Sequence, residues 1–485
     1  MTNEQKILTN LRGKGHRFSI GANGIEIVPA LKDSLMDQLK PYLNGITKEL
    51  AYEQLHPNAD QDRALKGVLD AIGANTVVAI TGAAGTGKSY SMASLVKQLP
   101  DDLNYVVTAP THKAVSVLHA NGVDHALTIK AATQRPIWTE SRTRLLNFLE
   151  GNGDLPTCFV FSKSVIKHAK EITRSHSAED GLRTMGLSAF DERLFQGWAL
   201  RDEAYDLIIV DEASMMSGDE LTKLRSITDT LILIGDPNQL QPVRSKSKMS
   251  LAYANATYRL SKVRRQANDS GVLDLAYAVL KGSRTPSQLL AFASNLDHVR
   301  VVDHFPKDAL WKVPALCWKN ESRIQIYQQW RNVCDLPKEK LVNGEPLICT
   351  GSKEHDLYIN GSRWWVSKSG WSKREIELFS DFDSTTHHVI ASVSEGQEFK
   401  GGVGVPLFKN GHGGAFFRHG AAITIHQSQG GQYPAALVAW PDIVAAYHMY
   451  DKPDDQGLRL WQRLAYVAIT RAEQKCFLCT SLEVE

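Results

Sequence analysis

The chain has 485 residues, of which 43% are apolar and 22% charged, the balance of a water-soluble protein long enough for about three domains. Its formal net charge is only +2, so bulk charge does not point to nucleic acid, and any surface that binds it must be local. No apolar run reaches membrane-spanning length or resembles a signal peptide, and six scattered cysteines do not suit a disulfide framework; both features predict a cytoplasmic protein without membrane contact.

Residues 1–50 are predicted to be a small N-terminal appendage. Apolar segments at 18–20 and 25–28 flank a Gly-Ala-Asn-Gly turn, which is the pattern of a β-hairpin. A helix is predicted after it from the four-residue spacing of Leu31, Leu35, Leu39 and Leu43. Nothing in this segment carries recognisable chemistry.

The clearest chemical motif follows an apolar strand predicted at 77–81. Residues 82–89 read Gly-Ala-Ala-Gly-Thr-Gly-Lys-Ser and open into a helix, the context that identifies a phosphate-binding loop. The glycines let backbone N–H groups turn toward phosphate oxygens at the N-terminus of that helix. Lys88 is suited to the β- and γ-phosphates, and the Ser89 hydroxyl to Mg²⁺. The predicted nucleotide-binding residues of this loop are Gly82, Ala83, Ala84, Gly85, Thr86, Gly87, Lys88 and Ser89.

Four further residues complete a predicted site for ATP hydrolysis. Gln61 precedes the phosphate-binding strand and presents both a donor and an acceptor to an adenine edge. Asp211 and Glu212 end an apolar strand, where Asp211 is suited to hold Mg²⁺ and Glu212 to accept a proton from the attacking water. Gln239 follows another buried strand, and its amide could orient that water or sense the γ-phosphate.

Two segments interrupt the α/β rhythm of the chain. Residues 135–203 combine aromatic residues, a turn and a charged helical pattern, which predict an inserted module. Residues 345–420, within a second α/β region that begins near 260, are turn-rich with short strands, the pattern of a small β-barrel insertion. Local basic clusters also occur, each more often a solvated face than a nucleic acid contact; one comprises Lys163, Lys167, Lys170 and Arg174.

Eight short stretches between residue 55 and the C-terminus follow the order of one known family. They are Gln61, GAAGTGKS (82–89), APTHKA (109–114), DEAS (211–214), GDPNQLQPV (235–243), LSKVRRQ (260–266), TIHQSQG (424–430) and LAYVAITRA (464–472). In these stretches the chain resembles the superfamily 1 helicases of the RecD-like branch, to which the phage Dda helicase belongs. The resemblance implies an α/β fold with two RecA-like parallel-sheet domains, at 51–258 and 259–485. It also implies a pin-type insertion at 135–203 in the first domain and a small SH3-like β-barrel insertion at 345–420 in the second.

The resemblance further implies that ATP binds between the two domains. Arg265 and Arg471 match the family arginines that reach across the cleft to the γ-phosphate. The implied catalytic set is Lys88, Glu212, Gln239, Arg265 and Arg471, and Gly430 joins the ATP-binding residues.

DNA contacts are implied by motif position, through groups suited to phosphate and sugar rather than to base edges. They are Pro110, Thr111, His112, Thr128, Asn238, Asn320, Thr424, His426 and Ser428. The aromatic side chains that could wedge the duplex at the pin are Trp138, Phe159 and Phe161. The sequence departs from the family at Gln427, where a lysine is usual, and at Lys130, where a histidine is common.

The function implied by the resemblance is an ATP-dependent DNA helicase that moves 5′ to 3′ on single-stranded DNA and separates duplex DNA with Mg²⁺ and ATP. Its implied partners are single-stranded and forked DNA, with a single-strand-binding or replisome protein, and it would act as a monomer in a bacterial or phage-infected cytoplasm. One alternative is an RNA helicase, or a translocase that remodels nucleoprotein without unwinding, because it would share every ATPase residue. Another is a nucleotide-switched nucleic-acid binding or loading protein, although a pure switch would not need the full hydrolytic set.

Overall fold

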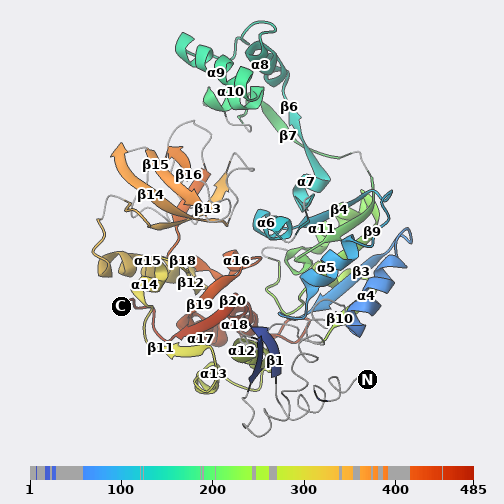
Figure 1. The fold of residues 1–485 in the computed structure, drawn as a ribbon, viewed down its shortest axis with the longest axis vertical. Helices are drawn as coiled ribbons and strands as arrows, with labels where there is room; N and C mark the ends of the chain where they lie inside the picture. The colour runs from blue at the N-terminus through green and yellow to red at the C-terminus, as the bar shows by residue number, and fades with distance from the viewer. Residues whose placement is uncertain are drawn as a thin grey trace.

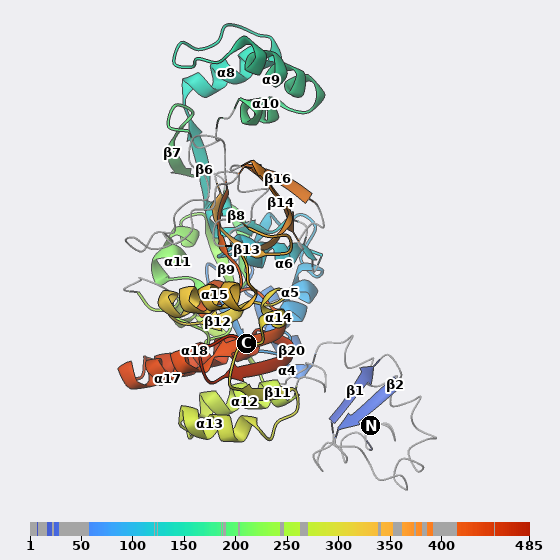
Figure 2. The same cartoon turned by 90° about the vertical axis from the view of Figure 1, so that its left-hand side faces the viewer.

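The computed structural model describes residues 7, 17–21, 24–28, 58–120, 122–123, 125–185, 187, 191–201, 204–242, 247–261, 270–337, 341–352, 361–372, 375–380, 386–390, 415–450 and 452–485. The predicted catalytic Arg265 and the helix expected around Leu31 to Leu43 lie outside these ranges. Figure 1 shows two α/β units side by side, and Figures 1 and 2 both show an arm that rises from the first unit and carries a group of helices at its end. No helix in the described ranges is both long and apolar enough to cross a membrane.

The first α/β unit contains a six-stranded parallel sheet in the order β10-β3-β9-β8-β4-β5. Its strands are β3 (Val77–Gly82), β4 (Tyr105–Ala109), β5 (Leu127–Thr128), β8 (Tyr205–Val210), β9 (Thr228–Gly235) and β10 (Ala256–Leu260). They are apolar on both faces because helices cover both sides, as is usual for parallel sheets. The sheet extends to Leu260, just past the domain boundary predicted at 258.

Alternate residues of β3 show how the helices of this unit are placed. Val78 and Ile80 pack with α4 (Ala59–Leu69), α5 (Lys88–Val96) and α6 (His112–Ala120). Val77 and Ala79 point to the other face and pack with α7 (Ile129–Thr133) and α11 (Gly218–Arg225). Two short 3-10 helices, η2 (Ala213–Met215) and η3 (Ser250–Tyr253), pack on this second face.

The second α/β unit contains a five-stranded parallel sheet in the order β11-β20-β19-β12-β18. Its strands are β11 (Val299–Val302), β12 (Ala315–Cys317), β18 (Ala422–Thr424), β19 (Tyr433–Ala439) and β20 (Ala472–Cys479). One face packs with α12 (Ser270–Lys281), α13 (Pro286–Ala293), α17 (Trp440–Met449) and α18 (Leu460–Thr470), and the other with α14 (Lys307–Leu310) and α15 (Asn320–Val333). The predicted α/β class with parallel sheets is confirmed.

Residues 134–200 form an arm and a lobe that project from the first unit (Figure 1). The arm is an antiparallel pair, β6 (Gln134–Trp138) and β7 (Phe195–Leu200). The lobe consists of α8 (Glu140–Glu150), α9 (Lys163–Ser175) and α10 (Ala178–Thr184), which share a core of their own. Phe159 lies inside that core, 3% exposed and stacked on Phe161, so it is no longer a candidate for a wedge that meets DNA.

The second unit carries a five-stranded antiparallel sheet in the order β16-β15-β14-β13-β17. Its strands are β13 (Pro346–Ser352), β14 (Arg363–Ser372), β15 (Glu375–Ser380), β16 (Thr386–Ile390) and β17 (Ala415–His419). They fall within the segment where the sequence predicts short strands. The N-terminal hairpin is also present, as β1 (Arg17–Gly21) and β2 (Gly24–Val28), with Ile20 paired to Ile25.

Candidate functional site

The predicted ATPase residues follow three neighbouring strands of the first sheet. β9 lies between β3 and β8, and all three are parallel, so their carboxyl ends meet at one edge. The phosphate-binding loop follows β3, Asp211 and Glu212 follow β8, and the segment that contains Gln239 follows β9. Open α/β sheets bind ligands at this edge. The fold therefore brings Lys88, Asp211, Glu212 and Gln239 to one place.

The phosphate-binding loop is wound by glycines in left-handed conformations. Gly85 and Gly87 have φ of +80° and +84°, values that L side chains rarely adopt. The Thr86 hydroxyl donates to the Ala83 carbonyl at 2.8 Å, which closes the turn. The Lys88 ammonium donates to the carbonyl oxygens of Gly82 and Ala83, at 2.8 and 3.1 Å, so its charge is held against the loop at the start of α5. This arrangement suits an anion at the helix N-terminus.

Gln61 is fully buried beside the end of this loop. Its Nε2 donates to the Gly87 carbonyl at 3.3 Å, and its Oε1 accepts from the Asn58 backbone at 3.0 Å. Asn58 in turn caps α4, so a capping box fixes the amide of Gln61. Each end of the amide retains one further hydrogen-bonding position. The predicted contact with adenine stays a prediction.

The acidic pair after β8 occupies a strained, partly buried turn. Glu212 has φ of +50°, an uncommon conformation that clusters at functional sites, and its N–H donates to Asp211 Oδ1 at 2.9 Å. Burial, and then the neighbouring Glu212 charge, raise the pKa of Asp211 to about 7, although the Lys88 charge acts in the other direction. A partly buried carboxylate with a raised pKa favours a nearby cation. The carboxylate of Asp211 and the hydroxyl of Ser89 are oxygen ligands of the type that Mg²⁺ accepts.

A chain of side-chain amides joins Glu212 to the second α/β unit. Gln239 Nε2 donates to Glu212 Oε2 at 3.2 Å, and Gln239 Oε1 accepts from Gln429 Nε2 at 3.4 Å. Gln239 is 4% exposed and Gln429 is 6% exposed, so water is largely excluded from this chain. Gln429 follows α16 (Ile425–Ser428), within the TIHQSQG stretch. A movement of the second unit would therefore shift the amide that contacts the carboxylate.

Two tyrosines of the second unit contact the phosphate-binding loop. The Tyr466 hydroxyl, from α18, accepts from the Ala84 N–H at 2.7 Å and donates to Asp236 Oδ2 at 2.5 Å. The Tyr277 hydroxyl, from α12, donates to the Ala84 carbonyl at 3.1 Å. Burial and the Asp236 charge hold the pKa of Tyr466 well above its usual value, so this group stays a hydroxyl. Both hydrogen-bonding groups of Ala84 are thus paired with the second unit.

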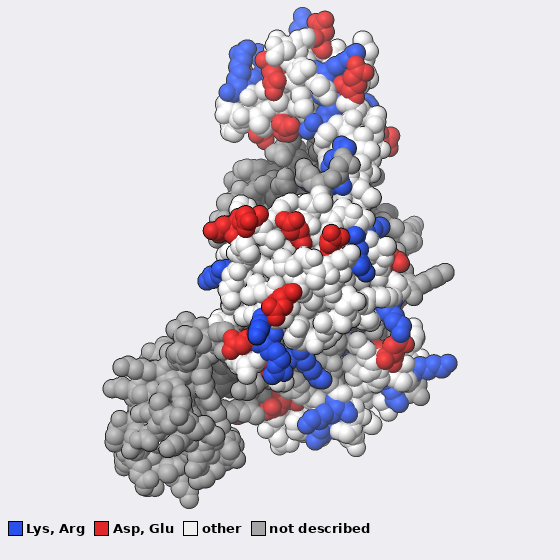
Figure 3. Space-filling view, turned by 90° about the vertical axis from the view of Figure 1, so that its right-hand side faces the viewer, with Lys and Arg blue, Asp and Glu red and all other residues white. Residues whose placement is uncertain are grey.

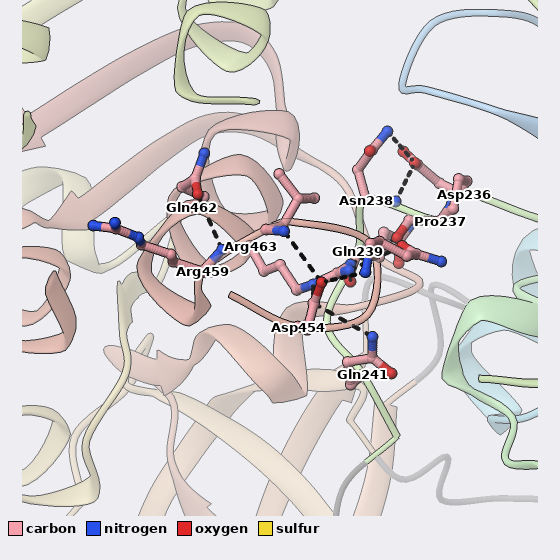
Figure 4. A network of polar contacts seen from close by, with 11 residues as sticks. Asp236, Pro237, Asn238, Gln239, Gln241, Asp454, Arg459, Gln462 and Arg463 are labelled. Atoms are coloured by element: carbon pink, nitrogen blue, oxygen red, sulfur yellow. Dashed lines mark hydrogen bonds and ion pairs between the residues drawn. The ribbon is translucent and has the colours of Figure 1, made fainter. Parts of the chain in front are cut away.

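Arg463 fastens the segment after β9 to α18 (Figure 4). Its guanidinium donates to the carbonyls of Pro237 and Gln239, at 2.6 and 2.5 Å, and pairs with Asp454 Oδ2 at 2.5 Å. Arg463 is 2% exposed. Partial burial acts to raise the pKa of Asp454, but the hydrogen bond and charge of Arg463, together with the backbone N–H groups of Gln456 and Leu458, outweigh it, so the pKa is lowered. Leu240 of the same segment packs into the core of the second unit, so the contact is apolar as well as polar.

The predicted cleft-crossing Arg471 lies at the C-terminal end of α18 and is buried. Its guanidinium donates to the carbonyls of Val467 and Gly431, at 3.1 and 2.9 Å. A Cβ on Gly431 would lie 2.1 Å from Lys113 Nζ, so the end of the Lys113 side chain, from α6, lies against this backbone. Lys113 also donates to the Tyr433 hydroxyl at 3.1 Å. Arg471 is thus connected through Gly431 to the start of α6.

Gly430 lies beside the same helix. The atoms nearest to a Cβ built on Gly430 belong to Ala114 and Thr111, at 3.4 and 3.6 Å. The structure therefore puts this residue between the two units at α6, and its predicted contact with ATP stays a prediction.

Three of the predicted DNA-contacting threonines begin short helices of the site. Thr111 Oγ1 accepts from Ala114 N at 3.1 Å, and Thr128 Oγ1 accepts from Ala131 N at 3.1 Å. Thr424 Oγ1 accepts from Gln427 N at 3.3 Å. The Gln427 side chain accepts in return from the Thr424 backbone at 3.4 Å, completing a capping box. The residue that departs from the family pattern therefore stabilises α16 through an uncharged contact.

The remaining predicted DNA-contacting residues differ in how exposed they are and in whether their side chains already form hydrogen bonds within the protein. Asn238 turns back on its own loop, where its Nδ2 donates to Asp236 Oδ1 at 2.9 Å. Ser428 is fully buried and donates to the Ile425 carbonyl at 2.7 Å. His426 is half-buried, and burial lowers its pKa from the ordinary value of 6.5. Pro110 and His112 lie between β4 and the first turn of α6.

Asn320, the last predicted contact, is organised by a residue that the sequence did not suggest. Asp442 of α17 is buried, and its Oδ2 accepts from the backbone N–H groups of Trp318 and Lys319, at 2.6 and 3.0 Å. Its Oδ1 accepts from the Ser322 hydroxyl at 2.6 Å. A carboxylate at this position satisfies the free N–H groups at the start of α15.

The site contains functional residues that sequence reasoning missed. Tyr466 and Arg463 lie in or beside the LAYVAITRA stretch, and Gln429 lies within TIHQSQG, so the motifs themselves were a usable signal. Tyr277 and Asp454 lie in no motif, and only the fold brings them to the interface. No contact with the ATPase loops can be described for Arg265, which lies outside the described ranges.

Two family models match separate parts of the chain. The model of the AAA domain family matches residues 56–304, and that of the UvrD-like helicase C-terminal domain matches residues 419–479. The ATP-dependent RecD2 DNA helicase of Deinococcus radiodurans is 23% identical over 308 residues, which cover 57% of this chain and 37% of that protein. The chain thus spans little more than a third of the length of this relative.

Two solved helicase structures are similar to this chain over most of its length. The Pif1 helicase of Candida albicans is 16% identical, with a TM-score of 0.46, and the match covers 88% of this chain and 94% of that one. Bacteroides Pif1 bound to single-stranded DNA is 16% identical, with a TM-score of 0.45, and covers 87% of this chain and 91% of its own.

Proposed function

Because the chain belongs to the AAA domain family and is a superfamily 1 helicase of the RecD-like type, we propose that it is a DNA helicase that moves 5′ to 3′ on single strands. It would separate duplex DNA by hydrolysing ATP with Mg²⁺ between two RecA-like domains, at 51–258 and 259–485. By the same resemblance it acts as a monomer on forked DNA in a bacterial or phage-infected cytoplasm, alongside a single-strand-binding or replisome protein.

The observation that carries this proposal is the amide chain from Glu212 through Gln239 to Gln429. A simple nucleotide switch needs no link between its hydrolytic carboxylate and a second domain. Here Glu212 can accept the proton of the attacking water while Gln239, which bonds to it, is held by the unit that contributes the TIHQSQG stretch. Hydrolysis would then respond to the position of the second domain, which is what a translocating motor requires.

The remaining chemistry is divided among residues of both domains. Lys88 and the loop N–H groups bind the phosphates, and Ser89 and Asp211 would hold Mg²⁺, which neutralises phosphate charge when bound. Arg471, and Arg265 by resemblance, would stabilise the charge of the transition state. The hydroxyl of Tyr466 accepts a hydrogen bond from Ala84 in the phosphate-binding loop, so this contact would form only when the two domains are close together.

We assign the DNA path to the loops that face each other at α6 and α16. Thr111, Thr128, Thr424 and His426 offer small polar groups for phosphate and sugar, which bind a strand without sequence preference. The arm with its lobe takes the position of the strand-separating pin, with Trp138 as the remaining aromatic candidate of the arm. The antiparallel sheet at 345–420 takes that of the SH3-like barrel.

The proposal is tested by steady-state ATP hydrolysis with no nucleic acid, with a DNA strand and with an RNA strand of the same sequence. DNA is expected to stimulate hydrolysis more than RNA, and Glu212→Gln is expected to lower the stimulated kcat by about 10²–10⁴-fold. Equal stimulation by RNA would favour an RNA helicase, and no stimulation by either strand would favour a nucleotide switch.

A further inference from the structure

The lobe at the end of the arm carries a straight row of basic side chains on one helix. Lys163, Lys167, Lys170 and Arg174 lie on α9 at positions i, i+4, i+7 and i+11. At 3.6 residues per turn these positions fall within an arc of about 60°, and at 1.5 Å per residue they span about 16 Å. We call these four residues the α9 stripe. The side chains of Lys163, Lys167 and Arg174 are exposed.

The other face of α9 is already used by the lobe. Ala169 is fully buried in the lobe core, and Ile166 packs against that core. A Cβ on Gly181 of α10 would lie 2.1 Å from Thr173 Oγ1, so α10 packs directly on this face. The apolar face is therefore unavailable to a membrane, although a basic amphipathic helix alone could suggest one. The α9 stripe points away from the core.

The charges of the lobe are distributed unevenly although their numbers balance. Residues 139–194 contain eight Lys and Arg and eight Asp and Glu, and Figure 3 shows both colours on the lobe. Off the stripe, cations are paired with acids: Arg142 with Glu179 at 3.1 Å, Arg144 with Glu140 at 2.7 Å, and Arg193 with Asp191 at 2.8 Å.

Among the residues that the structure describes, the stripe has no such neutralising partners. Within the described part of the chain, no acidic side chain lies within 4.0 Å of the charged groups of Lys163, Lys167 or Arg174. Lys170 Nζ lies over the ring of Phe148 at 3.9 Å, which orients it without removing its charge. Glu171, the one acid on α9, lies 3.9 Å from His168 instead. The lobe therefore presents one face of unpaired positive charge.

We propose that the α9 stripe binds the sugar–phosphate backbone of duplex DNA ahead of the fork, without regard to base sequence. This proposal rests on the helicase function proposed above. One strand of a duplex carries a phosphate every 3.4 Å along its axis, so about five phosphates lie along the length of the stripe. A stiff duplex suits a straight row on a rigid helix. A single strand is usually bound by stacking on aromatic side chains, and α9 contains no Phe, Tyr or Trp.

The test compares two triple variants of the full chain that each lose three exposed cations. Lys163→Ala/Lys167→Ala/Arg174→Ala removes the stripe, and Lys97→Ala/Lys223→Ala/Lys475→Ala removes charge from the two α/β units. Fluorescence anisotropy would measure the affinity of each for a labelled thymidine oligonucleotide and for the same strand extended by a duplex of two helical turns. Each affinity is measured over a salt series, and strand-stimulated ATP hydrolysis shows that each variant is folded.

The stripe variant is expected to retain single-strand affinity and stimulated hydrolysis while losing the extra affinity conferred by the duplex. The slope of log K (the association constant for the fork) against log salt is expected to be about 2.7 less steep for the variant, because it makes three fewer phosphate contacts. The ratio of wild-type to variant affinity for the fork is therefore expected to fall about 40-fold between 50 and 200 mM salt. The control variant is expected to match the wild type.

Three outcomes would overturn the proposal. Wild-type affinity and salt slope on the fork would mean that the stripe is a solvated face or serves an acidic protein. An equal loss on fork and single strand would move the contact to the translocating strand, and an equal loss in the control would mean a general charge effect. If no nucleic acid stimulates hydrolysis by the wild type, the helicase proposal fails separately, because the comparison of fork binding does not use ATP.

Discussion

The hydroxyl of Tyr466 lies 2.7 Å from the backbone nitrogen of Ala84, although the two residues are 382 positions apart in the chain. It joins the last helix of the second α/β unit to the phosphate-binding loop of the first. The same hydroxyl donates to Asp236, so one oxygen connects two loops of the proposed nucleotide site. The two units are therefore in direct contact at that proposed site.

Tyr466→Phe is expected to lower strand-stimulated kcat by about tenfold, because it removes a hydrogen bond to a carboxylate that contributes about 1.5 kcal/mol. Nucleotide affinity without DNA is expected to change little. Tyr447→Phe is the matched control, because Tyr447 packs through its ring against Trp461 in the same unit. An unchanged kcat for Tyr466→Phe would mean that this contact does not accompany hydrolysis.

The Gln239–Gln429 contact can be measured by a double-mutant cycle. Gln239→Ala and Gln429→Ala are each expected to lower the stimulated kcat, and their effects to overlap by about 1 kcal/mol, or about fivefold. Gln427→Ala, in the same segment but outside the amide chain, is expected to add independently to Gln239→Ala. If the effects of Gln239→Ala and Gln429→Ala on the stimulated kcat were strictly additive, the two side chains would not be coupled, and the proposed link to Glu212 would be contradicted.

Arg463 is expected to be a stability residue of the interface. Arg463→Met removes the donor from two carbonyls and the charged partner from Asp454, so the free energy of unfolding is expected to fall by about 3 kcal/mol. Arg463→Lys is expected to restore little, since an ammonium cannot reproduce the fork of contacts. Urea unfolding provides the measurement. Arg144→Met, which breaks an exposed pair, is the control and is expected to cost less than about 1 kcal/mol. A similar loss in both variants would contradict this role.

These contacts show what the sequence could and could not predict. Lys88, Asp211 and Glu212 could be found because a phosphate-binding loop and an acidic pair after a strand are local patterns with known chemistry. The sequence did not indicate Tyr466, Tyr277 and Arg463. A tyrosine or arginine on an apolar helix is usually a core or surface residue, and only the fold shows which loop it contacts. The strand β11 was missed because Val299–Val302 is short and interrupted by Arg300.

The two insertions illustrate the same limit. Residues 135–203 were expected as a pin, but their charged helical pattern forms a separate lobe whose core buries Phe159. Only a tertiary contact distinguishes a buried phenylalanine from an exposed wedge. Gln427 stands where the family usually has a lysine, and it completes the capping box of α16, a role visible only once the helix start is known.

Arg471 is expected to affect chemistry more than binding. Arg471→Ala is expected to lower kcat for ATP hydrolysis by about 10³-fold, the effect typical of an arginine that stabilises transition-state charge. The dissociation constant for ATP, measured with a fluorescent analogue, is expected to change only a few-fold. Arg471 also holds the Gly431 carbonyl, so the affinity for single-stranded DNA is the control measurement. A twofold change in kcat would mean that Arg471 acts only as a structural donor.

His426 is expected to be neutral at pH 7. Burial lowers its pKa below 6.5, so the native state takes up its proton at lower pH than the unfolded chain. Its contribution to stability is therefore complete above about pH 6.5 and is lost as the pH falls. An NMR titration of labelled histidine, with His426→Asn to assign the resonance, measures the midpoint. A midpoint at or above 6.5 would contradict this effect of burial.

The central claim is tested most directly by strand separation on two partial duplexes, one with a 5′ single-stranded tail and one with a 3′ tail, in the presence of ATP and Mg²⁺. Lys88→Ala serves as the blank, because it removes the phosphate-binding charge. Unwinding from the 5′ tail alone is the predicted result. Unwinding from the 3′ tail alone would contradict the proposed direction, and strand-stimulated ATP hydrolysis without unwinding of either substrate would replace the helicase by a translocase.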